Sequence, residues 1–101
     1  MKDVISKAEV ALDYPDKTYI GFFDRHSRYA VEASGKSMII KLEHRGEERK
    51  VVDIHFEYPL LASIVEDFGE LRDAHAEIPQ FEREHLVRAF TAVAAAIAAV
   101  K

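Results

Sequence analysis

The sequence contains no cysteine. Disulfide bonds, zinc sites with thiolate ligands, iron–sulfur clusters and thiol catalysis are therefore excluded. The chain must hold its fold by packing alone, which is usual for proteins of the cytoplasm. We accordingly expect a cytoplasmic protein.

Long hydrophobic runs are also absent. The longest apolar run, residues 92–100, is far shorter than the ~20 residues that a membrane-spanning helix needs. Residues 1–7 have no continuous apolar stretch of signal-peptide length. We therefore expect neither a membrane anchor nor an export signal.

Glycine is scarce, and the known catalytic and cofactor motifs are missing. The 4 glycines are Gly21, Gly35, Gly46 and Gly69, which lie too far apart to form a glycine-rich phosphate loop. Neither Gly-x-Ser-x-Gly nor His-Glu-x-x-His occurs. We expect no cofactor.

The composition is that of one small globular domain. The chain has 101 residues, of which 49% are hydrophobic and 32% charged. Disordered chains lack that much apolar surface, and two ordinary domains would need a longer chain. We therefore predict a single domain over residues 1–101.

The residue patterns predict an α+β fold. Apolar residues at helical spacing from Val4 to Leu12 predict an N-terminal helix over residues 3–13, ended by Pro15. Residues 18–57 are typical of a four-stranded antiparallel meander. Two C-terminal helices are expected at about 59–76 and 79–100, opened by Pro59 and Pro79 and packed on one face of the sheet.

Pairing rules predict the register of this meander. A two-residue turn at Ser34-Gly35 would place Val31 opposite Met38, and a turn at residues 24–27 would place Phe22 opposite Tyr29 and Ile20 opposite Val31. A loop around Gly46 would create the pairs Leu42 with Val52, Ile40 with Ile54, Met38 with Phe56, and Lys41 with Asp53. A slip by one residue between residues 38–42 and 52–56 would set apolar against charged side chains, so the register of this pair is well specified.

This register gives the sheet one apolar and one polar face. The apolar face is formed by Ile20, Phe22, Tyr29, Val31, Met38, Ile40, Leu42, Val52, Ile54 and Phe56. The polar face carries an apolar patch of Tyr19, Phe23 and Ile39, which are candidates for contact with a partner.

The last helix has no polar face at its C-terminal end. Its large apolar residues, at steps of four and three, are Leu86, Phe90, Val93, Ile97 and Val100, and the residues around them after Arg88 are mostly alanine. Such spacing is typical of a helix–helix seam, and an all-apolar helix is normally buried on more than one face. It lies either between the sheet and another helix of its own chain or against a partner, most simply a second copy.

Two groups of polar residues are candidates for chemistry. His55 stands between Asp53 and Glu57 on one face of a strand, where a carboxylate can tune an imidazole for acid–base catalysis. Glu82 and His85 have the Glu-x-x-His spacing of di-iron helices, although those sites need the motif twice and it occurs here once. The alternative for both groups is an ordinary solvated charged surface.

The charge distribution bears on partners. The net charge is −4, whereas residues 25–50 hold seven Lys/Arg and four Asp/Glu. These basic residues fall mostly in turns, so we do not expect nucleic-acid binding. The sequence favours a non-enzymatic interaction module of the adaptor or chaperone kind, self-associating through the alanine-rich helix. The alternative is a small-ligand-binding protein or enzyme with its polar site at Asp53, His55 and Glu57 or at Glu82 and His85.

Overall fold

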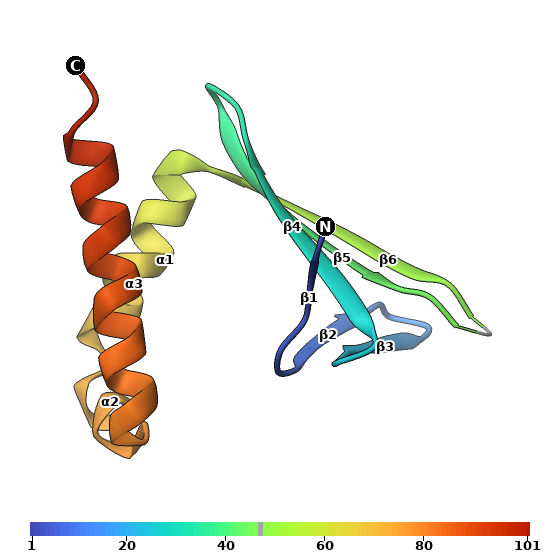
Figure 1. The fold of residues 1–101 in the computed structure, drawn as a ribbon. Helices are drawn as coiled ribbons and strands as arrows, with labels where there is room; N and C mark the ends of the chain where they lie inside the picture. Colours follow the sequence, from blue (N-terminus) through green and yellow to red (C-terminus); the bar gives the residue numbers. More distant parts are fainter. Residues whose placement is uncertain (47) are drawn as a thin grey trace. The chain divides into compact units, whose positions relative to one another are not determined.

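A computed structural model describes residues 1–46 and 48–101 of the chain. These residues form two compact units, Met1–Ala62 and Ser63–Lys101. The first unit contains six strands and the start of the first helix, and the remaining helical residues belong to the second unit (Figure 1). The α+β class with an antiparallel sheet is as predicted, while the prediction of a single domain stays a prediction.

The N-terminal region forms strands, so the predicted helix over residues 3–13 is wrong. Strand β1 (Lys2–Asp3) is followed by β2 (Ala8–Asp13), which pairs antiparallel with β3 (Thr18–Phe23). Residues 14–17 connect β2 to β3 with Pro15-Asp16 at the tip, and backbone hydrogen bonds in both directions between Tyr14 and Lys17 close the turn. Pro-Asp is a common turn pair, and the apolar residues from Ala8 to Leu12 fit a strand period as well as a helical one.

The larger sheet has the strand order β1-β4-β5-β6. Strand β4 (Ser27–Ala33) pairs with β1 on one side and with β5 (Ser37–His44) on the other. Strand β3 therefore does not belong to a four-stranded meander, and the predicted pairs of Phe22 with Tyr29 and Ile20 with Val31 are wrong. The chain turns sharply at Asp24–Ser27, where the Ser27 N–H donates to the Asp24 carbonyl at 2.9 Å, and β1 takes the position predicted for β3.

The register between β5 and β6 (Lys50–Glu57) is confirmed in full. The observed pairs are Leu42 with Val52, Lys41 with Asp53, Ile40 with Ile54, and Met38 with Phe56. Directly paired residues point to the same face of a sheet, so these even-numbered side chains share one face. The exposed fraction alternates accordingly along β6, with Val52, Ile54 and Phe56 less exposed than their odd-numbered neighbours.

The register between β4 and β5 differs from the prediction by two residues. Val31 pairs with Ile40 rather than Met38, and Tyr29 pairs with Leu42. The Ser34 hydroxyl accepts hydrogen bonds from the N–H groups of Lys36 and Ser37, at 3.2 and 3.3 Å, and moves the tip of the turn to Gly35-Lys36. Because the shift is an even number, every side chain keeps its predicted face.

The β2–β3 hairpin covers one end of the apolar sheet face. Leu42 on β5 is buried, and Phe23 on β3 has no exposed surface. A side chain at Gly21 of β3 would lie 3.9 Å from Cδ of Lys50, which is on the even-numbered face of β6. Toward the other end of this face Val31 is 59% exposed.

Three helices follow β6: α1 (Tyr58–Glu70), α2 (Arg72–Glu77) and α3 (Gln80–Ala98). The predicted helix at 59–76 is interrupted because Leu71 has a non-helical ψ of 59°. Pro79 precedes α3 as predicted. The packing of the helices on the sheet stays a prediction. Among the described residues, no helix is long and apolar enough to cross a membrane.

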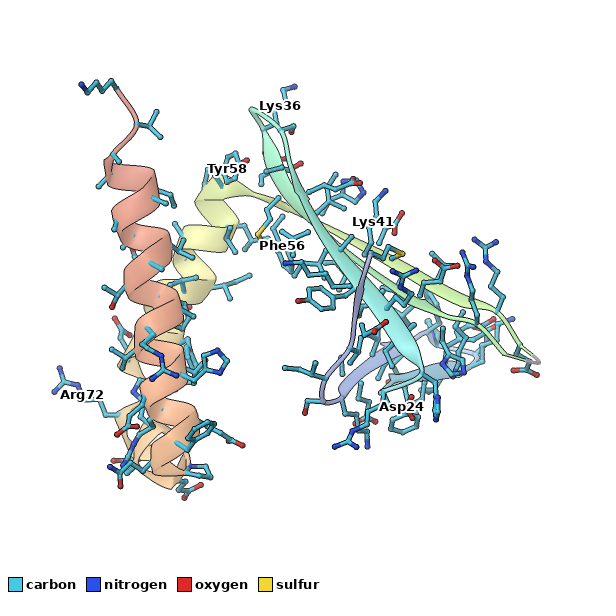
Figure 2. The ribbon with its side chains drawn as sticks, viewed as in Figure 1. Asp24, Lys36, Lys41, Phe56, Tyr58 and Arg72 are labelled. Atoms are coloured by element: carbon cyan, nitrogen blue, oxygen red, sulfur yellow. The ribbon has the colours of Figure 1, made fainter. Side chains whose placement is uncertain are left out.

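The start of α1 is tied to the β4–β5 turn. The Tyr58 hydroxyl donates to the backbone carbonyls of Ser34 and Ser37, the second at 3.2 Å. Figure 2 shows Lys36 at the tip of this turn and Tyr58 where the helix begins. These bonds fix the position at which the chain leaves β6.

Candidate interaction surface

We call the second unit, Ser63–Lys101, the helical unit. It exposes a row of large apolar side chains along α3, which we call the seam. Its large residues become more exposed toward the C-terminus: Leu86 is 38% exposed, Phe90 42%, Val93 56%, Ile97 70% and Val100 79%. None of the residues of α1, α2 or α3 is buried. Taken by itself, this unit therefore has a large apolar surface of the kind that another surface, of the same chain or of a partner, normally covers.

The N-terminal half of this seam is partly covered by the preceding helices. The chain passes along α1, turns at α2 and returns along α3 (Figure 1). The Phe68 ring of α1 lies 6.3 Å from the Phe90 ring of α3, measured between centroids. Nε2 of His75 on α2 donates to the Phe68 carbonyl at 2.7 Å, which ties α2 to the end of α1. The half from Val93 to Val100 has no comparable ring contact among the described residues.

A groove of about 500 Å³ lies within the helical unit, beside the covered half of α3. Its apolar lining includes Val65 and Phe68 of α1, Ile78, and Leu86, Val87 and Phe90 of α3. His75 and Arg83 add the ionisable groups of the lining. Leu86 and Phe90 thus belong both to the groove lining and to the seam, which Val93, Ile97 and Val100 continue.

The polar residues on β6 that are candidates for acid–base catalysis do not come together in a site. Asp53, His55 and Glu57 are all exposed on the odd-numbered face of β6, as their spacing predicts. Within the described part of the chain, no side-chain hydrogen bond or ion pair joins them, and the residues opposite them on β5 are Lys41, Ile39 and Ser37. These three side chains lie on an exposed, charged face of β6.

The helix candidates are similarly isolated. Glu82 and His85 are exposed on α3, and the groove lining includes neither of them. Across residues 1–46 and 48–101, no group of three or more His, Asp or Glu side chains is arranged to hold a metal ion.

The predicted apolar patch on the outer sheet face is divided by the fold. Tyr19 is 49% exposed on β3, whereas Ile39 is partly buried on β5 in the other sheet. Phe23 is fully buried, so the prediction that it faces outward is wrong. Its side chain belongs to the core under the β2–β3 hairpin.

The sequence did not predict a polar network at the corner between β3 and β4. Oγ of Ser27, which is 1% exposed, accepts the Asp24 N–H at 3.1 Å and is hydrogen-bonded to Nδ1 of His44 at 3.0 Å. The Asp24 carboxylate accepts the His26 N–H, and this bond, aided by the charges of His26 and His44, lowers the pKa of Asp24. Because the Ser27 hydroxyl is enclosed, the network holds a turn and offers no nucleophile to a substrate.

A second cluster, which is charged, is centred on Glu43 of β5. Its side chain points to the opposite face of the sheet from that of its neighbour His44. Oε1 of Glu43 accepts Nε of Arg45 at 2.9 Å and lies 3.6 Å from Nε of Arg49. The hydrogen bond from Arg45 and the two positive charges lower the pKa of Glu43. Both guanidinium groups are mostly exposed, so the cluster is screened by salt.

No protein-family model, curated protein or solved structure matches this chain.

Proposed function

We propose that this chain is a non-enzymatic protein-interaction module that assembles as a homodimer through α3. The supporting observation is the apolar seam of α3, whose last three large residues are between 56% and 79% exposed. Asp24, Ser27 and His44 do come together, but the Ser27 hydroxyl is enclosed, whereas the large apolar side chains of the seam are exposed.

The energetics of the helical unit favour a partner. Segments below about 40 residues rarely build a sufficient core without metals, disulfides or association, and Ser63–Lys101 is of that size. Burying a Val or Ile side chain contributes roughly 1.5–3 kcal/mol relative to leaving it in water. Covering Val93, Ile97 and Val100 in both copies would therefore supply a substantial part of the stability of this unit.

The chemistry of the seam favours a second copy over a charged partner. Between Arg88 and Lys101, α3 and its C-terminal extension carry no charged residue, so this stretch offers no electrostatic selectivity. Alanine between the large residues lets two helices approach closely, as in the small-residue interfaces of paired helices. A surface of this kind is complementary to itself around a twofold axis.

The test is sedimentation velocity of the wild-type chain and of two variants with the same charge change. Ile97→Glu places a carboxylate in the seam and is expected to give a folded monomer at a concentration where the wild type is a dimer. Ala95→Glu is the matched control, because two residues correspond to about 200° around the helix, and it should remain dimeric. A wild type that is monomeric at high micromolar concentration, or an Ile97→Glu variant that still dimerises, would overturn the proposal.

A further inference from the structure

We infer that the two copies pair their α3 helices antiparallel, with Val93 at the twofold axis and the C-terminal half of each α3 in the groove of the other copy. This inference rests on the proposed homodimer and adds its geometry. Three independent features of the helical unit support it: the spacing of the seam, the gradient of exposure and the position of Arg83.

The spacing of the seam is symmetric about Val93. Leu86 and Val100 are each seven residues from Val93, while Phe90 precedes it by three residues and Ile97 follows it by four. Reversing the helix therefore brings Leu86 to the level of Val100 and Phe90 to the level of Ile97. All five large residues then meet a large apolar residue of the second copy.

The gradient of exposure distinguishes antiparallel from parallel pairing. The N-terminal half of α3 is beside the groove and contacts Phe68, whereas Ile97 and Val100 are 70% and 79% exposed. In an antiparallel pair, the bare Ile97 and Val100 of each copy reach Phe90 and Leu86 of the other, which line the groove. In a parallel pair, the exposed C-terminal ends of the two α3 helices would meet each other, and the groove of each copy would stay open to water.

Arg83 supports the same orientation. It precedes Leu86 by three residues, so it continues the seam, and it lines the groove. Among the described residues its side chain has no ion pair. Parallel pairing would place the two Arg83 guanidinium groups against each other, which is unfavourable. Antiparallel pairing about Val93 removes this repulsion, because each Arg83 then lies beyond the C-terminal end of the other α3 (Gln80–Ala98) and far from the second Arg83.

Single cysteines test this arrangement, because the natural chain has none and each variant holds one thiol. A disulfide requires Cα atoms within about 7 Å, so only residues at the same level of the pair can be linked. Val93→Cys is expected to form a disulfide with its own copy under mild oxidation. Leu86→Cys and Val100→Cys should each remain uncrosslinked alone, but form a mixed disulfide when combined, with one chain lengthened by a tag to identify the product. Arg72→Cys on α2 is the control for random collision.

The outcomes separate this inference from the proposed function. Efficient crosslinking of Leu86→Cys with itself and of Val100→Cys with itself would show parallel pairing. Dimeric variants in which no pair crosslinks above the Arg72→Cys control would place α3 elsewhere. Parallel pairing would overturn the antiparallel geometry and leave the homodimer through α3 standing. A dimer without crosslinks would overturn both the geometry and the role of α3, and monomeric wild-type protein in sedimentation would remove the homodimer itself.

Discussion

Oγ of Ser27 lies 3.0 Å from Nδ1 of His44, a residue seventeen positions further along the chain. The two residues are opposite each other at the end of the β4–β5 pair. The same hydroxyl accepts the Asp24 N–H, so one buried side chain joins the turn after β3 to the end of β5. The corner that separates the two sheets is therefore held by polar bonds as well as by the packing of Phe23.

Ser27→Ala is expected to destabilise the protein. The change leaves the Asp24 N–H and the His44 ring without their partner, and losing a buried hydrogen-bond partner costs roughly 1–3 kcal/mol. Urea denaturation followed by circular dichroism measures the change. Ser6→Ala is a suitable control, because Ser6 is exposed and surface substitutions usually change stability by less than about 0.5 kcal/mol. Equal denaturation midpoints for the two variants would show that the network contributes nothing.

The strand pairing that depends on side-chain alternation could be predicted from the sequence. Along β5 and β6 a slip by one residue would expose the apolar set, so Ile40 and Ile54 identify each other as partners. The N-terminal region lacks this constraint. Residues from Ala8 to Leu12 satisfy both periods, and the outcome depends on pairing with β3, which a local pattern does not contain.

Gly35→Ala is expected to stabilise the β4–β5 hairpin by about 0.4–1 kcal/mol, because alanine restricts the unfolded chain where the native backbone accepts it. None of the described glycines has a positive φ, and a side chain at Gly35 would meet no atom within 4 Å. Thermal unfolding measures the effect. Gly69→Ala, in α1 with similarly open space, is the positive control. Destabilisation by Gly35→Ala alone would indicate that Gly35 needs a left-handed backbone conformation, which alanine disfavours.

The candidate interaction surface was predictable only in part. The seam from Leu86 to Ile97 follows from helical spacing, because these residues lie on one continuous helix, and Val100 lies just beyond its end. The groove beside it depends on how α1, α2 and α3 meet, and the approach of Phe68 to Phe90 joins positions that the sequence gives no reason to pair. Phe23 was misplaced for a related reason, since its burial follows from the separate β2–β3 hairpin.

The Glu43 cluster is expected to make stability depend on pH and salt. Arg45 and Arg49 hold the pKa of Glu43 below its ordinary value of 4.5 in the folded protein. The cluster therefore contributes stability that is complete above the unfolded pKa and is lost as the pH falls through the lower folded pKa. Glu43→Gln should be less stable than the wild type near pH 7, and the difference should shrink as the pH is lowered below 4.5.

Denaturation midpoints of both proteins from pH 7 to pH 3 measure this difference. Because both arginines are mostly exposed, added salt should reduce it. Arg45→Gln removes the principal partner of the carboxylate and is expected to reproduce most of the effect of Glu43→Gln, while combining the two changes should add little to either alone. Additive losses in the double variant, or a difference from the wild type that stays constant across this pH range, would show that the Arg45–Glu43 contact does not stabilise the end of β5.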